Sequence, residues 1–178
     1  MSNHKIIFTG PVGAGKTTAI SAISDIPPVI TDESASDMTK SRKANTTVAM
    51  DYGVMNLDRT DRIHLYGTPG QERFDFMWEI LTEGGIGLIL LLNNSRPDPF
   101  QDMRFFLNAF GEFIKTTRVV IGVTRMDESR RPTIADYHLQ LEDTDNKIPI
   151  FEVDARERRD VSLLIEALLY SLDPGLVA

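Results

Sequence analysis

The chain has 178 residues, a formal net charge of −7 and no cysteine, with 42% hydrophobic and 25% charged residues, which are ordinary proportions for a soluble globular protein. This length suffices for one domain with a buried core, so we expect a single domain over residues 1–178. The acidic balance argues against nucleic acid or an anionic membrane as a partner, and the absence of cysteine excludes disulfides, thiolate metal sites and prenyl or palmitoyl anchors.

The first predicted elements enclose a glycine-rich loop. Residues 5–9 (KIIFT) read as a strand, and residues from Gly15 to about Ile26 read as a helix that Pro27 and Pro28 stop. Between them, residues 10–17 (GPVGAGKT) match G-x-x-x-x-G-K-[ST], the phosphate-binding loop. The sequence therefore predicts a nucleotide site here.

Each residue type in this loop has a physical reason. Gly10 permits a backbone conformation that other residues avoid, while Gly13 and Gly15 permit close approach without a Cβ clash. Backbone N–H groups then face the phosphates at a helix N-terminus. Lys16 is expected to reach the β- and γ-phosphates, and the Thr17 hydroxyl to bind Mg²⁺. The expected nucleotide contacts from this loop are Gly10, Val12, Gly13, Ala14, Gly15, Lys16, Thr17 and Thr18.

The remaining elements alternate between strands and helices. Further strands are predicted at residues 48–57, 62–66, 86–92, 119–123 and 148–153, and further helices at residues 73–82, 134–141 and 161–172. A polar turn at residues 58–61 indicates an antiparallel hairpin. Asp98 and Pro99 start another helix, whose buried stripe is predicted to be Phe100, Met103, Leu107, Phe110 and Ile114.

This order predicts an α/β fold of the P-loop NTPase class. We expect a doubly wound, mostly parallel six-stranded sheet with one antiparallel edge hairpin and helices on both faces. Ligands of such sheets bind beyond the carboxyl ends of the strands. Four loops are expected there, at residues 10–17, 67–71, 124–127 and 154–156.

Those four loops, in this order, resemble the loops of a Ras-like small GTPase over essentially the whole chain. The segments TTVAMDYG (46–53), YGTPGQERF (66–74) and FMW (76–78) resemble more closely the bacterial Ras-like GTPases of the gliding-motility polarity (MglA) and conservon type. The resemblance implies one GTPase domain that binds GTP or GDP with Mg²⁺ and acts as a molecular switch.

The resemblance also assigns roles to the switch residues. Thr47, or less well its neighbour Thr46, is similar to the switch I threonine that contacts Mg²⁺ and the γ-phosphate. Gly70 corresponds to the switch II glycine whose N–H meets the γ-phosphate. Gln71 corresponds to the glutamine that orients the attacking water. The implied catalytic set is thus Lys16, Thr47 and Gln71, with Thr17 and Thr47 on the metal.

Base recognition is expected from the last two loops. By the resemblance, residues 124–127 (TRMD) stand at the N/T-K-x-D motif, with Thr124, Arg125 and Asp127 in contact with the nucleotide. The Asp127 carboxylate can accept two hydrogen bonds from guanine, which adenine does not offer on that edge. Arg125 replaces the usual lysine, and the two are not equivalent. Asp154, Ala155 and Arg156 stand where the family has Ser-Ala-Lys, so the Ala155 N–H is implied to meet the guanine carbonyl.

Two departures from Ras affect the expected metal binding and the expected rate of hydrolysis. Gly67 occupies the position of the aspartate that holds Mg²⁺ through water, so Mg²⁺ would depend on Thr17, Thr47, phosphates and water. Thr46 occupies the position of the intrinsic arginine of the polarity GTPases. Since such an arginine is typically worth about three to five powers of ten in rate, the resemblance implies slow unaided hydrolysis.

Partners and rival functions complete the prediction. Trp78 with Phe74, Phe76 and Met77 forms an apolar group that is either core or, by resemblance, a surface for an effector or a roadblock-type dimeric activator. No signal segment or membrane span is recognisable, so a cytoplasmic location is expected. The rivals are a guanine-nucleotide-loaded interaction module with little turnover and, less favoured, a small P-loop kinase using ATP.

Overall fold

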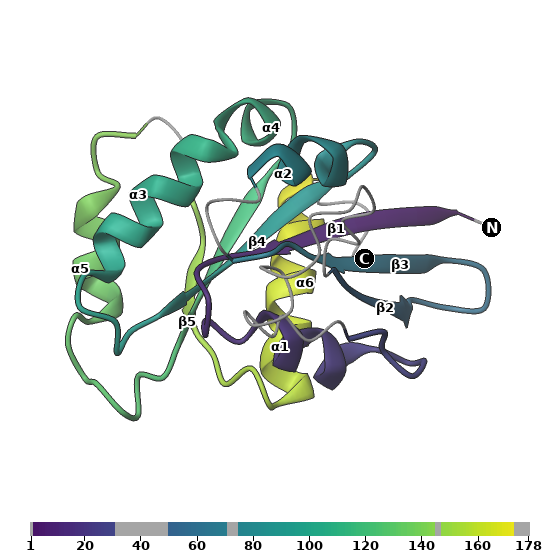
Figure 1. Ribbon diagram of the computed structural model, residues 1–178, viewed down its shortest axis with the longest axis horizontal. Helices are drawn as coiled ribbons and strands as arrows, with labels where there is room; N and C mark the ends of the chain where they lie inside the picture. Colours follow the sequence, from purple (N-terminus) through teal and green to yellow (C-terminus); the bar gives the residue numbers. More distant parts are fainter. Residues whose placement is uncertain (1, 31–49, 71–74, 145–146, 173–178) are drawn as a thin grey trace, which may run out of the picture.

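A six-stranded sheet in the order β2-β3-β1-β4-β5-β6 forms the centre of the computed structural model, and helices cover both of its faces (Figure 1). The structure describes residues 2–30, 50–70, 75–144 and 147–172. The strands are β1 (Asn3–Thr9), β2 (Asp51–Asn56), β3 (Arg62–Gly67), β4 (Gly87–Asn93), β5 (Val119–Thr124) and β6 (Ile150–Glu152). All neighbouring strands are parallel except β2 and β3. This arrangement confirms the predicted mostly parallel, doubly wound fold of the P-loop NTPase class.

Two hydrophobic cores lie on opposite faces of the sheet. Helices α1 (Lys16–Ile23) and α6 (Arg158–Leu172) pack on one face, where Ile6 and Phe8 of β1 point. Helices α2 (Asp75–Thr82), α3 (Pro99–Ala109), α4 (Gly111–Thr116) and α5 (Ile134–Gln140) cover the other face, toward which Ile7 points. The alternation in β1 follows from the two-residue period of a strand. Among the described residues, no helix combines the length and apolar character needed to cross a bilayer.

The antiparallel hairpin lies at one edge of the sheet, as predicted. Its turn is held by Asp58, whose Oδ1 accepts hydrogen bonds from the backbone N–H groups of Thr60 (2.6 Å) and Asp61 (2.8 Å). The resulting register places Asp51 of β2 opposite Gly67 of β3. The residues predicted as strand before Asp51 lie mostly outside the described part of the chain.

The helix after β4 starts as predicted but is interrupted. The Asp98 carboxylate accepts a hydrogen bond from the Gln101 N–H (3.0 Å), and Pro99 occupies the first turn. The prediction of one continuous stripe through Ile114 was wrong, because Phe110 leaves helical geometry (φ −96°, ψ 13°) and α4 begins anew at Gly111. Glycine has low helix propensity, which favours a break here. Phe106, outside the predicted stripe, is buried instead of Leu107.

The first helix is also shorter than predicted. It ends at Ile23, and Ser24 has an extended backbone (φ −67°, ψ 132°). The Ser24 hydroxyl accepts a hydrogen bond from the Val54 N–H (3.1 Å) and donates to the Ile26 carbonyl (2.8 Å). Contact with β2, and not the two following prolines, therefore sets the end of this helix.

Candidate functional site

The glycine-rich loop connects β1 to α1 at the carboxyl end of the sheet. Gly10 has φ 143°, and a Cβ there would lie 2.1 Å from the Leu91 carbonyl oxygen, so no larger residue fits. Gly15 is the N-cap residue directly before α1 with φ 100°, and a Cβ there would lie 3.0 Å from the Ala155 Cβ. Gly13 differs from the expectation of close approach. A Cβ at Gly13 would meet nothing within 4 Å, and its left-handed φ of 80° is what favours glycine.

Lys16 lies along this loop with its side chain largely buried. Its ammonium group donates hydrogen bonds to the carbonyl oxygens of Gly10 (2.6 Å) and Pro11 (2.9 Å). Gly70 approaches from the loop after β3, where a Cβ would lie 2.8 Å from the Lys16 Nζ and 2.6 Å from the Val12 nitrogen. The two predicted phosphate-binding segments are thus in direct contact, and glycine at position 70 is required by that contact.

The end of β3 is fixed to β1 by buried polar contacts. The Thr68 N–H donates to the Phe8 carbonyl (2.9 Å), and the Thr9 and Thr68 hydroxyl oxygens lie 2.8 Å apart. Both threonines are almost completely buried. Gln71 and Thr47, the other predicted switch residues, lie outside the described residues.

The predicted base-recognition loop follows β5. The buried Thr124 hydroxyl is within hydrogen-bond distance of the carbonyl oxygens of Ala14 (2.9 Å) and Leu92 (3.1 Å), which connects this loop to the phosphate loop. Arg125 has a left-handed backbone (φ 60°) and forms an ion pair with Glu128 (3.0 Å). Asp127, two residues on, is exposed.

The loop after β6 contributes an ion pair. The Arg156 Nε and Nη2 donate to the two carboxylate oxygens of Asp154 (2.9 and 2.7 Å), and the Arg156 N–H donates to the same carboxylate (2.9 Å). These side-chain and backbone hydrogen bonds lower the pKa of Asp154 to about 2. Asp154 and, more weakly, Asp127 raise the pKa of Arg156. Ala155 between them is buried against Gly15.

These loops surround two adjacent cavities. The larger, of about 520 Å³, lies between the loops after β5 and β6. The smaller, of about 300 Å³, lies between the phosphate loop and the loop after β3. Gly15, Thr18 and Arg125 line both cavities. Every predicted binding residue in the described part of the chain lines one or both cavities, except Gly10, the first residue of the loop, which packs against the backbone of Leu91.

The two cavities differ in charge. Lys16 and the N-terminal end of α1 make the smaller cavity suitable for anionic phosphates. The larger cavity combines the Asp127 carboxylate with the backbone around Ala155, which suits a ring that has hydrogen-bond donors and acceptors on its edge. Together they fit a ligand with an anionic end and a planar polar end.

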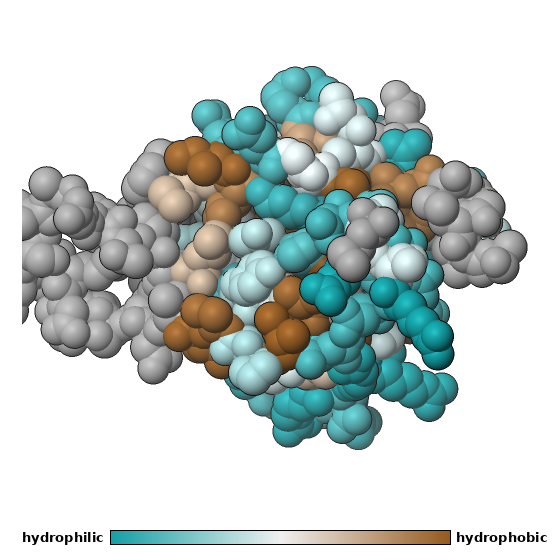
Figure 2. Space-filling view, turned by 90° about the vertical axis from the view of Figure 1, so that its right-hand side faces the viewer, coloured by the Kyte–Doolittle hydropathy of each residue, from teal (hydrophilic) through white to brown (hydrophobic). Residues whose placement is uncertain are grey.

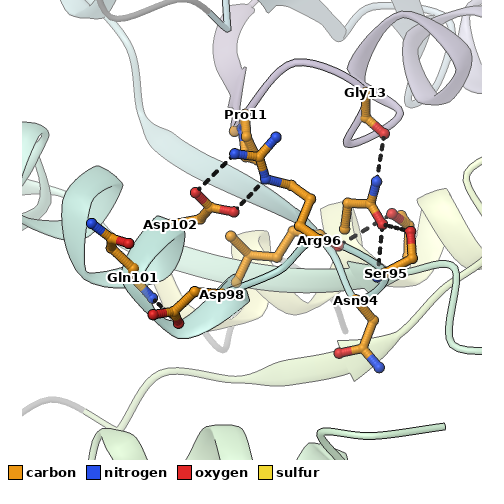
Figure 3. Close-up of polar contacts among 12 residues, drawn as sticks. Pro11, Gly13, Asn94, Ser95, Arg96, Asp98, Gln101 and Asp102 are labelled. Atoms are coloured by element: carbon orange, nitrogen blue, oxygen red, sulfur yellow. Dashed lines mark hydrogen bonds and ion pairs between the residues drawn. The ribbon is translucent and has the colours of Figure 1, made fainter. Parts of the chain in front are cut away.

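The sequence analysis missed three contributors to this site. Asp51 lines the smaller cavity and accepts a hydrogen bond from the Thr17 hydroxyl. Ile30, which is 46% exposed, lines the same cavity. Asn93 at the end of β4 donates to the Gly13 carbonyl (3.4 Å) and accepts from the Ser95 N–H and hydroxyl (2.9 and 2.6 Å; Figure 3). The sequence signal that could have identified Asn93 is the polar pair Asn93–Asn94 directly after the apolar residues of β4.

Asn94 forms hydrogen bonds with the segment that follows the base-recognition loop. Figure 3 shows it pointing away from Gly13. Its amide donates to the carbonyl oxygens of Ser129 (2.7 Å) and Pro132 (3.0 Å), and its oxygen accepts from the Tyr137 hydroxyl (2.7 Å). Burial raises the pKa of Tyr137 further above its ordinary value. This buried network fixes where the chain beyond Asp127 runs.

Residues 8–171 match the model of a family described as "conserved hypothetical ATP binding protein". The chain belongs to this family. Among curated proteins, 92 residues are 30% identical to the uncharacterized protein MJ1339 of Methanocaldococcus jannaschii, covering 52% of this chain and 52% of that relative. The chain thus spans about half the length of MJ1339.

Two further curated proteins match over longer stretches. Ras-related protein RabC of Dictyostelium discoideum is 22% identical over 178 residues, which cover 96% of this chain and 84% of RabC. GTP-binding protein YPT1 of Saccharomyces cerevisiae is 21% identical over 161 residues, which cover 88% and 72% of the two chains. The family match and these distant relatives support a nucleotide-binding P-loop protein.

The contribution of the contact between Thr124 and the phosphate loop can be tested by measuring the free energy of unfolding. Thr124→Val keeps the side-chain volume but removes the hydroxyl that reaches the Ala14 and Leu92 carbonyls. We expect the free energy of unfolding, measured in urea, to fall by about 1–3 kcal/mol, since buried carbonyl oxygens lose a donor. Thr124→Ser, which keeps the hydroxyl, is the control and should lose less. A valine variant as stable as the wild type would contradict this role.

The Asp154–Arg156 pair predicts a pH dependence. Because the Asp154 pKa is lowered to about 2, its contribution to stability is present above the unfolded-state pKa of about 3.9 and is lost as the pH falls toward 2. NMR titration of the carboxyl carbon should show this low value. In Arg156→Gln the Asp154 pKa should rise toward its ordinary value, and an unchanged pKa would contradict the pairing.

Proposed function

We propose that the chain is a GTP-binding and GTP-hydrolysing molecular switch, slow on its own, that regulates a protein partner through its switch loops. The observation that carries the proposal is the adjacency of the two cavities, with Lys16 and Thr17 lining one, Asp127 lining the other and Gly15 lining both. A nucleotide extends from an anionic phosphate chain to a polar purine, and the two cavities differ in the same way.

The phosphate end of the site fits a triphosphate. Backbone N–H groups of the phosphate loop and the N-terminus of α1 favour negative charge, and Lys16 would exchange its contacts with the Gly10 and Pro11 carbonyls for phosphate oxygens. The Thr17 hydroxyl lies in the same cavity and would ligate Mg²⁺. Mg²⁺, when bound, would neutralise charge that develops on the phosphates.

The base end favours guanine over adenine. The Asp127 carboxylate would accept hydrogen bonds from the guanine N1–H and amine, two donors that adenine does not offer on that edge. The name of YPT1 also states GTP binding. The family description instead states ATP binding, which favours an adenine-nucleotide P-loop enzyme as the second candidate. Guanine presents two donors to Asp127 and adenine does not, so the preference for a guanine or an adenine nucleotide distinguishes the two candidate functions.

Hydrolysis is assigned to residues at the phosphate end. In the proposed reaction a water oxygen forms a bond to the γ-phosphorus while the bond to the β,γ-bridging oxygen breaks, giving GDP and phosphate. Gln71 would orient the water, Lys16 would stabilise phosphate charge, and Thr47 would contact Mg²⁺ and the γ-phosphate. With Thr46 in place of an arginine, we propose slow turnover that an activating partner accelerates.

The partner is proposed to be a protein effector or activator, with a roadblock-type dimer as one form of the latter. Trp78 does not belong to that surface, because it is 4% exposed and stacks on Phe110 with ring centroids 5.0 Å apart. Exposed apolar side chains that line the smaller cavity are Val12 and Ile30. Figure 2 shows the side of the molecule that carries the N-terminus and the β2–β3 turn, where hydrophobic side chains lie in separate groups among polar ones. We retain the MglA/conservon subgroup and a cytoplasmic location as parts of this proposal.

Base recognition is testable by a change of nucleotide preference. Asp127→Asn replaces a carboxylate acceptor by an amide, which can donate to the C2 carbonyl of xanthine but faces an amine in guanine. We expect GDP affinity to fall at least about 10-fold, as for the loss of one charge-assisted hydrogen bond, and xanthosine diphosphate affinity to rise. Calorimetry measures both, and Asp143→Asn, an exposed site away from both cavities, is the matched control. Unchanged affinities in Asp127→Asn would contradict the assignment.

Trp78 provides a direct test of switching, because it is the only tryptophan of the chain. Its indole N–H donates to the Pro69 carbonyl (3.3 Å), next to Gly70, so movement of that loop should change its fluorescence. After loading with GTP, the emission should return to the GDP value at the rate of hydrolysis. In Gln71→Leu it should stay at the GTP value.

Two outcomes would contradict the switch. Identical Trp78 emission with GDP and a non-hydrolysable GTP analogue would support the rival static interaction module. A difference in emission with no decay, with or without an added partner, would show a nucleotide sensor that does not hydrolyse GTP.

A further inference from the structure

Thr17, the hydroxyl residue of the phosphate loop, has a carboxylate partner. The Thr17 Oγ1 donates a hydrogen bond to the Asp51 Oδ2, which reaches it from the first residue of β2. Both residues line the smaller cavity, together with Lys16. Among the described residues that line this cavity, Asp51 is the one with a carboxylate.

Asp51 occupies space that a side chain at position 67 would need. The two residues are directly opposite in the β2–β3 register. A Cβ on Gly67 would lie 3.2 Å from the Asp51 Cβ, 3.5 Å from its Oδ2 and 3.0 Å from the Ile20 Cδ1. An acidic residue at position 67 and the observed Asp51 side chain therefore compete for one region beside the phosphate loop.

The donor set in that region suits a hard divalent cation. Mg²⁺ prefers oxygen ligands and is usually held by one or two carboxylates or hydroxyls together with phosphate oxygens and water. A hydroxyl and a carboxylate already within hydrogen-bond distance of each other, at the N-terminus of α1, provide two such oxygens. No other acidic group in the described lining is available for this purpose.

We infer that Asp51 is the acidic group of the Mg²⁺ site, supplied by β2 across the hairpin from the position where Gly67 has no side chain. This inference rests on the proposed nucleotide-binding function. When the metal binds, Thr17 exchanges its hydrogen bond to Asp51 for the metal, and Asp51 turns its negative charge to the cation. Because Asp51 lies only four residues after Thr47 in the sequence, metal binding is coupled directly to the strand that follows switch I.

The test is a Mg²⁺ titration of nucleotide affinity. Asp51→Asn keeps an oxygen that accepts from Thr17 but removes the charge. We expect the Mg²⁺ concentration that half-saturates tightening of a fluorescent GDP analogue to rise about 10- to 100-fold. Affinity in EDTA should stay within about twofold of the wild type. Glu112→Gln, which removes an exposed carboxylate on α4, is the control and should titrate as the wild type does.

An exchange variant tests the geometry. Asp51→Gly alone should lose the Mg²⁺ response, and Asp51→Gly combined with Gly67→Asp should recover part of it, because removal of Asp51 frees the space beside Gly67. Recovery only in the exchange variant supports the inference. A wild-type Mg²⁺ response in both Asp51→Asn and Asp51→Gly overturns it.

The same titration separates this inference from the proposed function. Normal GDP binding with an Mg²⁺ response independent of Asp51 overturns the inference alone. Binding of an ADP analogue in place of the GDP analogue overturns the guanine assignment, and the effect of Asp51→Asn is then measured with ADP. Absence of binding by either nucleotide overturns both.

Discussion

The close approach of residue 10 to the backbone of β4 determines where the phosphate loop lies. With the Leu91 carbonyl oxygen 2.1 Å from the place of a Cβ, only glycine allows β1 and β4 to pair fully and the chain still to turn outward. From that turn the loop reaches Gly15, where α1 begins. Lys16, the first residue of α1, therefore follows directly on a loop whose start is fixed against β4.

The other loops are then fixed relative to the phosphate loop by short-range contacts. Thr124 joins the base-recognition loop to Ala14, Ala155 packs on Gly15, and Gly70 lies against Val12 and Lys16. Each contact uses a small side chain or a single hydroxyl, so the loops approach closely without losing the space between them. A site assembled in this way is bounded by segments from four different strand ends.

In the β2–β3 hairpin, an acidic side chain on either strand can occupy the same region beside the phosphate loop. Directly opposite residues of an antiparallel pair lie about 4.5–5.5 Å apart. A carboxylate on β2 can therefore reach the region that a carboxylate on β3 would otherwise occupy. Asp51 and Gly67 form such a pair, and the absence of an acid at one position is matched by its presence at the other. A motif that lacks one residue in the sequence can thus be complete in the fold.

The sequence predicted most of the fold because its signals are local. The phosphate loop is a contiguous motif, the buried strands are apolar runs, and a four-residue polar turn defines the hairpin. The position of Asp51 opposite Gly67 was not predicted, because it depends on the observed register of the hairpin, in which Asn56 pairs with Arg62, and its contact with Thr17 depends on how α1 packs against β2.

Other features depended on packing between distant segments. The break at Phe110 is hidden in a regular apolar spacing, and burial of Trp78 depends on aromatic rings from α3. The roles proposed for Thr47 and Gln71 lie outside the described residues and stay predictions.

The central claim is that one purine nucleotide occupies both cavities, with its phosphates at Lys16 and its base at Asp127. The most direct measurement is isothermal titration calorimetry of the nucleotide-free protein with GDP and with ADP. The account predicts binding of one GDP per chain, with ADP weaker by at least about 10-fold, the factor expected when a charge-assisted hydrogen bond is lost. Equal or tighter binding of ADP, or no binding of GDP, would contradict it.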